Sequence, residues 1–277
     1  MKTAYTGWMW VNQYVENSEE FRNQFIQCVK ELSYLGYDYL ENFPFLKRHF
    51  TSSEVKKICN QYGVSMSALY CNLSEGLDEL KEDAEYTAEM GGKYLICSSQ
   101  NWPEDQGLDS LADWDAVNKD AFLCNELGAY CKDVGIKLLH NHHSYTTVCR
   151  RPEIDAFARQ TNPEFVGFCV DDGHAMVAGV NIIQLIKDYA DRIEYVHIKD
   201  LDLTLSWRGR GMSWVPLGLG TLDLPGFFKA LREIEFDGIV CAGLPAGCEK
   251  INHFESARLS RLYLRSAQGL YCLLYTS

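Results

Sequence analysis

The chain alternates eight short β-rich runs with eight amphipathic helix patterns, and this alternation limits its fold more than any other feature. The predicted strands are residues 4–10, 37–43, 64–73, 93–99, 136–142, 166–171, 193–200 and 238–244. The predicted helices are residues 18–35, 53–62, 77–90, 115–134, 152–161, 182–191, 224–234 and 254–266. Strands separated by helices pair in parallel through right-handed crossovers, and eight such units in about 250 residues close into a barrel. We therefore predict an α/β fold, a single (β/α)8 TIM barrel.

The barrel is predicted to occupy residues 1–270 as one domain, because no linker or change in composition divides the chain. A doubly wound open sheet is the alternative. It usually places a Gly-rich phosphate-binding turn after its first strand, and none follows residue 10. Residues 271–277 are uncharged, lack helix caps and fall outside the repeat, so we predict a non-native tail there.

Charge and hydropathy exclude several classes of partner. The 26 Lys and Arg residues against 38 Asp and Glu residues give a net charge of −12, which opposes binding to nucleic acid. No run approaches the ~20 apolar residues that span a bilayer, so no membrane partner is expected. The first ten residues lack the apolar core of a secretory signal, and the cysteines form no C-x-x-C pair. A cytoplasmic protein with reduced thiols is the expectation.

Candidate site residues follow from where the strands end, because barrel enzymes carry their catalytic groups at the carboxyl ends of strands. Side chains alternate along a strand, so parity predicts which of them face the barrel mouth. The predicted mouth residues are Glu41, His140, His142, Asp171, His197 and Lys199. Imidazole and carboxylate ligands suit Mn, Fe, Co or Zn. A hydrogen-bonded polar network without an ion is the alternative.

A second group of residues is predicted to contact a substrate. Aromatic faces pack against the C–H side of sugars and Arg reaches hydroxyl or phosphate oxygens, so the Trp- and Arg-containing loop at residues 201–222 suggests a lid. No Gly-rich nucleotide motif is present, and no nucleotide cofactor is expected. The predicted substrate contacts are Trp8, His174, Arg208, Arg210 and Trp214.

Four segments carry a resemblance to a known family. They are KLLHNHHSYTT at 137–147, NPEFVGFCVDDGHAMVAG at 162–179, DYADRIEYVHIKDLD at 188–202 and VPLGLGTLDLPGFFKAL at 215–231. Together they resemble the xylose-isomerase-like barrels, the sugar phosphate isomerase/epimerase proteins, and within these the inosose dehydratases. The resemblance covers the chain to about residue 270.

The resemblance implies a metal-assisted enzyme acting on a keto-sugar or keto-inositol. Members usually bind one divalent metal through Glu, Asp, His and Glu, and the matching Asp and His here are Asp171 and His197. Two departures stand out: His140 replaces the first Glu, and Gly243 replaces the last. The resulting hypothesis is a weaker, nitrogen-rich site of His140, Asp171 and His197.

The implied reaction is proton removal next to a carbonyl, followed by isomerisation, epimerisation or loss of a β-hydroxyl. Glu41 is the candidate base, and His140 or His142 is the candidate acid or third ligand. Lys199 is predicted to contact a substrate oxygen, or else to form a salt bridge with Asp200 or Asp202. The sequence leaves open whether the chain forms a homo-oligomer.

Two other functions compete with this one. A non-catalytic sugar-binding or accessory subunit is favoured by the ligand lost at Gly243. A nuclease of the endonuclease IV type would share the barrel and the multi-His metal centre, but the acidic chain lacks a basic stripe.

Overall fold

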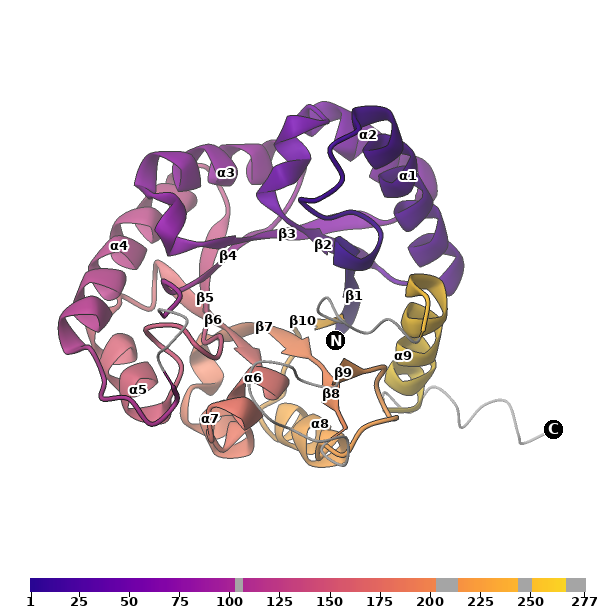
Figure 1. Ribbon diagram of the computed structural model, residues 1–277. Coiled ribbons are helices and arrows are strands. Elements are labelled where there is room, and N and C mark those ends of the chain that lie inside the picture. Colours follow the sequence, from indigo (N-terminus) through magenta and orange to yellow (C-terminus); the bar gives the residue numbers. More distant parts are fainter. Residues whose placement is uncertain (103–106, 203–213, 244–250, 268–277) are drawn as a thin grey trace.

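Eight parallel strands close into a barrel with helices around it (Figure 1). The computed structural model describes residues 1–102, 107–202, 214–243 and 251–267. Neighbouring barrel strands follow one another in the sequence, and β10 closes the ring by pairing with β1. The barrel strands are β1 Lys2–Thr6, β2 Tyr39–Asn42, β3 Ser65–Asn72, β4 Tyr94–Ser98, β5 Lys137–Asn141, β6 Val166–Asp171, β7 Ile193–Ile198 and β10 Ile239–Ala242. The predicted fold is confirmed.

The helices lie close to their predicted positions. Cap residues explain several boundaries: Asn17 accepts a hydrogen bond from the Glu20 amide, and Gly36 ends the first helix with a left-handed backbone. The eight helices that cover the barrel are α1 Ser18–Leu35, α2 Ser52–Tyr62, α3 Leu77–Glu89, α4 Trp114–Asp133, α5 Arg151–Gln160, α7 Ile182–Asp188, α8 Leu224–Glu233 and α9 His253–Ala267.

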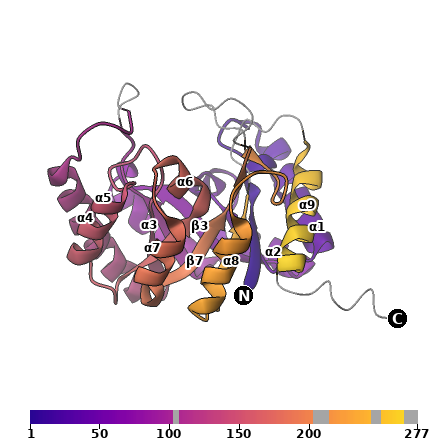
Figure 2. The ribbon, with the colours of Figure 1, turned by 90° about the horizontal axis from the view of Figure 1, so that it is seen from below.

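Three short elements depart from the predicted pattern. The predicted first strand ends at Thr6, and Gly7–Met9 form a 3₁₀ turn instead. A six-residue helix, α6 Asp172–Val177, follows β6 directly. Within the region predicted as a loop, β8 Asp200–Leu201 and β9 Trp214–Val215 pair as an antiparallel hairpin. Seen from the side, α6 lies at the end of the barrel opposite the N-terminus, which is the end where the strands finish (Figure 2).

Two apolar layers fix the direction in which each strand residue points. The larger layer lies between the strands and the helices. The smaller layer fills the barrel interior and consists of Ala4, Ala68, Ile96, Leu139, Cys169, Tyr195, Ile239 and Cys241. Since side chains alternate along a strand, the residues two positions beyond these interior residues face the mouth.

The hairpin is held by one buried carboxylate. Asp200 accepts hydrogen bonds from the backbone amides of Gly218 and Gly220, each at 2.9 Å, and from Leu222 at 3.2 Å. Its own neighbour Leu201 donates a fourth, at 2.9 Å. A single side chain therefore organises the connection between β9 and α8, beside the mouth.

No helix in the described part of the chain is long and apolar enough to cross a membrane. The predicted tail at 271–277 lies outside the described residues.

Replacing Asp200 with Asn should destabilise the protein by about 2–4 kcal/mol, because a buried carboxylate accepting several amide hydrogen bonds becomes a neutral group that cannot satisfy all of them. Urea unfolding followed by circular dichroism measures the loss. Asp133→Asn, at an exposed position on α4, is the matched control and should change stability by less than about 0.5 kcal/mol. Equal stability of the two variants would contradict this role for Asp200.

Candidate functional site

A buried histidine connects two carboxylates across the barrel mouth. The Nε2 atom of His197 on β7 lies 2.8 Å from Oε2 of Glu41 on β2. Its other ring nitrogen, Nδ1, lies 3.5 Å from Oδ2 of Asp171 on β6. All three residues are at least nine-tenths buried. The sequence prediction that these three side chains face the mouth agrees with their positions.

Strand β1 lies between β2 and β10 beside this contact. Its inward residue Ala4 pairs with Cys241 on one side and Tyr39 on the other, and Thr6, the next inward residue, is the register partner of Glu41. Further along β10, a Cβ atom at Gly243 would overlap the methyl group of Thr6.

Asp171 is held from several directions. Its Oδ2 forms an ion pair with the Lys199 ammonium, and its Oδ1 accepts the backbone amide of His174 at 3.0 Å. The second contact makes Asp171 the N-cap of α6, where a negative charge is favoured by the helix dipole. Of the two alternatives for Lys199, a substrate contact or a salt bridge, the structure shows a salt bridge, but it is with Asp171 on β6 and not with Asp200, whose carboxylate accepts the hairpin amides.

The charges of the mouth balance. Burial alone would lower the pKa of His197, but Cys169, Glu41 and Asp171 together outweigh it and hold that pKa well above its usual value. Burial likewise opposes ionisation of Asp171, yet Lys199 and the neighbouring histidines keep its pKa well below the usual range. Two carboxylates thus face an imidazolium and an ammonium, and their net charge is zero.

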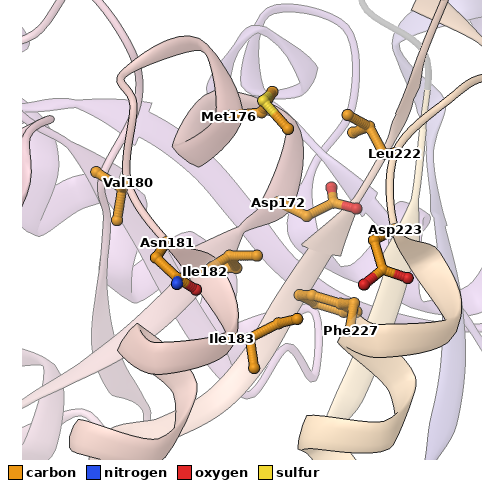
Figure 3. Close-up of a pocket in the computed structure, with 9 residues that line it drawn as sticks. All are labelled: Asp172, Met176, Val180, Asn181, Ile182, Ile183, Leu222, Asp223 and Phe227. Atoms are coloured by element: carbon orange, nitrogen blue, oxygen red, sulfur yellow. The ribbon is translucent and has the colours of Figure 1, made fainter.

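Asp172 differs from its neighbour. Burial, and then repulsion from Asp171, raise its pKa well above the ordinary value. Its Oδ1 accepts the backbone amide of Lys199 at 2.8 Å, while Oδ2 finds no donor among the described residues. Asp172 lines a cavity of about 240 Å³ between α6, α7 and α8, in which the Asp223 carboxyl group also lies (Figure 3).

The predicted orientation of His140 is wrong. Strand β5 turns Leu139 into the barrel interior, so His140 points to the helices, where its ring lies 4.1 Å from that of Phe157 on α5. Its Nε2 is 3.0 Å from the Ser99 hydroxyl. The inward residue at the end of β5 is Asn141, which accepts a hydrogen bond from the Tyr70 hydroxyl at 3.2 Å.

The other predicted histidines lie beside Asp171 rather than in the centre of the mouth. His142 Nε2 is 3.2 Å from the backbone carbonyl of Asp171. The rings of His143 and His174 lie tilted against each other with centroids 3.5 Å apart, and the Trp214 ring lies 5.6 Å from that of His174. His174 Nδ1 also meets the Ser144 hydroxyl at 2.8 Å. His174 and Trp214 are buried, and the Nε2 atom of His174 lies 4.0 Å from Oδ2 of Asp171.

A cavity of about 740 Å³ opens at the mouth. Trp8 lines it, packed against Phe43 at 4.9 Å between ring centroids. Tyr70 lines it too, and its ring lies 5.7 Å from that of His197, which connects the cavity to the buried centre. The predicted contacts Arg208 and Arg210 lie outside the described residues.

The predicted metal set of His140, Asp171 and His197 does not converge. His140 faces away from the mouth, and the Oδ2 atom of Asp171 is already paired with Lys199. Among the described residues, one other group brings ligand atoms within 4.8 Å of one another, and it consists of Glu41, His197 and Cys241. Sequence reasoning missed Cys241, although it shares the inward parity of Ile239 on the same strand.

The buried, uncharged state of His140 predicts an acid-sensitive fold. Burial lowers the pKa of His140 to about 3, whereas the unfolded chain has a pKa of about 6.5. The unfolded state therefore binds the extra proton between these values, and stability is lost as pH falls below about 6.5. His140→Gln should flatten the stability profile between about pH 6 and 4.5 by up to ~1.4 kcal/mol per pH unit.

Urea unfolding at a series of pH values measures that slope for both proteins. An unchanged slope in the variant would contradict the buried neutral position of His140.

Comparison with known proteins finds relatives in sequence and in structure. An inosose dehydratase from Geobacillus kaustophilus is 29% identical, with 92% of this chain and 91% of that protein covered. Among solved structures, D-allulose 3-epimerase from Methylomonas sp. in complex with D-allulose has a TM-score of 0.77 at 16% identity, covering 98% and 97% of the two chains. The IOLI protein with a binding zinc atom has a TM-score of 0.76 at 19% identity, covering 98% and 99%. The family described as xylose isomerase-like TIM barrel matches residues 29–266, and the chain belongs to that family.

Proposed function

We propose that the protein is an enzyme that removes a proton next to the carbonyl of a keto-sugar or keto-inositol, leading to isomerisation, epimerisation or dehydration. The observation that carries the proposal is the buried arrangement of Glu41, His197 and Asp171. Tyr70, whose ring lies 5.7 Å from that of His197, connects this arrangement to the cavity of about 740 Å³ that it lines. The inosose dehydratase relative and the sugar epimerase neighbour support the same reaction class.

Proton abstraction needs a base and a stabilised enediolate. The Glu41 carboxylate accepts the C–H proton, and the bond electrons move to the carbonyl oxygen. Once Glu41 is protonated, the Nε2–H of His197 turns from Glu41 to that oxygen and hydrogen-bonds to it, while Asp171 keeps the ring oriented through Nδ1. Reprotonation of the carbon completes isomerisation or epimerisation.

Dehydration uses the same groups in a second step. The enediolate expels the β-hydroxyl group, which leaves as water after accepting a proton from His197. Lys199 holds Asp171 in its charged form throughout, so Lys199 is a positioning residue that does not need to touch the substrate. When bound, a divalent ion at the mouth would supply Lewis acidity for the carbonyl oxygen.

The walls of the cavity favour an uncharged substrate. Trp8, Phe43 and Tyr70 offer aromatic faces for the C–H side of a ring, and polar groups such as Asn101 lie among them. The charged residues on the described wall are one arginine and two glutamates, namely Arg48, Glu75 and Glu79. Two carboxylates against one guanidinium disfavour a phosphate group, so the proposed substrate is an unphosphorylated keto-polyol.

Proton exchange in deuterated water tests the reaction. The protein should incorporate deuterium at the carbon beside the carbonyl of a keto-inositol or ketose, measured by proton NMR. Glu41→Gln should slow the exchange by about 10²–10⁴-fold, because general base catalysis is worth that much. Glu126→Gln, an exposed change on α4, is the matched control and should leave the rate unchanged.

Three outcomes would each contradict a part of the proposal. Exchange that survives Glu41→Gln would remove Glu41 from the role of base. No exchange with any keto-inositol or ketose would instead favour a sugar-binding or accessory role. Faster exchange with phosphorylated than with unphosphorylated ketoses would overturn the substrate class alone.

A further inference from the structure

One buried carboxylate oxygen points into the cavity between α6, α7 and α8 (Figure 3). Asp172 is 4% exposed, and its Oδ1 accepts the backbone amide of Lys199 at 2.8 Å. Its Oδ2 has no hydrogen-bond partner among the described residues. An ionised Oδ2 lacks a donor and a protonated Oδ2 lacks an acceptor, so neither state satisfies this atom. Because buried polar atoms are nearly always hydrogen-bonded, the oxygen indicates a partner inside the cavity.

The size of the cavity suits a small ring compound. Most of its wall is apolar and comes from Met176, Val180, Ile182, Ile183, Leu222 and Phe227. The cavity measures about 240 Å³, whereas an apolar cavity of about 150 Å³ is large enough to bind benzene. The additional space therefore accommodates a short polar arm on such a ring.

The cavity has an exposed end and a buried end. Met176 is 41% exposed, and Asn181 and Asp223 are exposed as well. Phe227 and Asp172, in contrast, are only 1% and 4% exposed. A ligand can therefore enter from solvent and place a polar group against the buried carboxyl group of Asp172.

The charges around the cavity favour a cation. Asp172 and Asp223 line it, and no Lys, Arg or His does so among the described residues. The Lys199 ammonium forms its ion pair with Asp171, on the side of the mouth. A buried carboxylate is costly unless a positive charge pairs with it. A ligand with an ammonium group would supply that charge and donate the missing hydrogen bond.

We propose that this cavity binds a small primary ammonium compound, whose ammonium group contacts Oδ2 of Asp172 and whose apolar ring packs against Ile183 and Phe227. Asp223 adds a second negative charge at the rim. Burial and repulsion from Asp171 raise the pKa of Asp172, and the positive charge of the ligand offsets both, so a proton on Asp172 passes to solvent on binding. The cavity shares no described lining residue with the mouth, so this inference goes beyond the proposed function and does not rest on it.

The backbone amide of Lys199 reports on the site, because it donates its hydrogen bond to the same carboxyl group. Benzylammonium is the probe, and NMR on the full chain labelled with ¹⁵N-lysine follows it. The Lys199 amide signal, assigned by its loss in Lys199→Arg, should shift and saturate with a Kd of about 1 mM or lower. Benzyl alcohol has nearly the same shape without the charge. It should bind at least about tenfold more weakly, because hydrogen bonds between charged groups are stronger.

Two variants locate the probe, with calorimetry as the measure of affinity. Asp172→Asn keeps the shape of the side chain and removes its charge, so benzylammonium should bind about 10–100-fold more weakly while benzyl alcohol changes less than about threefold. Ile183→Trp fills the cavity from a half-buried position on α7 and should abolish binding of both compounds. Asp133→Asn, an exposed change on α4, is the matched control and should leave both affinities unchanged.

The Ile183→Trp variant keeps the test decisive if Asp172→Asn does not fold, which circular dichroism establishes. Absence of saturable benzylammonium binding would overturn the proposal and leave water as the occupant of the cavity. Equal affinities for benzylammonium and benzyl alcohol would overturn the cationic class of ligand. Binding that survives Asp172→Asn or Ile183→Trp would place the probe elsewhere, for example against the glutamates Glu75 and Glu79 of the mouth, and would also overturn the proposal.

Discussion

The mouth of the barrel depends on one buried imidazole held between two carboxylates. His197 contacts Glu41 through one nitrogen and faces Asp171 through the other, and so joins strands that lie far apart in the sequence. Burying charges is costly unless they are paired. The Lys199 ammonium supplies the second positive charge, so the two carboxylates remain ionised in a place that water barely reaches.

The arrangement extends outward from Asp171. Its side chain caps α6, and the next residue, Asp172, accepts the Lys199 amide and borders the cavity beneath the hairpin. The tilted rings of His143 and His174 pack against each other, and the indole of Trp214 packs against His174. Movement of Asp171 would therefore disturb both the start of α6 and the orientation of His197.

Much of this was predictable from the sequence, for identifiable reasons. The alternation of strands and helices implies the barrel because parallel pairing leaves few other closed arrangements. The sequence predicts which side chains of β6 face the barrel, because the alternate residues Val166, Phe168 and Val170 are apolar and pack against helices. The sequence does not predict this for β5, because the polar residue His140 lies buried and uncharged against Phe157 on the helix side of the strand.

Long-range contacts account for the other differences. For Lys199 the alternatives are a substrate oxygen or a salt bridge with a neighbouring aspartate. It pairs with Asp171 instead, because Asp200 binds backbone amides of the hairpin connection, which no local pattern indicates. Cys241 was detectable by parity, but its significance arises only when β10 closes the ring next to His197. Sequence periodicity defines which face a residue occupies, whereas side-chain partners across the barrel require the closed structure.

The protonation state of His197 in the metal-free protein tests the account most directly. Two-bond proton–nitrogen NMR on protein labelled with ¹⁵N-histidine reports both ring nitrogens, and His197→Asn assigns the signal. The surroundings of His197, which are Cys169 and the two carboxylates, raise its pKa, so both nitrogens should stay protonated at pH 7.5, about one unit above the usual pKa of histidine. A single neutral tautomer of His197 at that pH would show that the carboxylates do not hold an imidazolium, and would contradict the account.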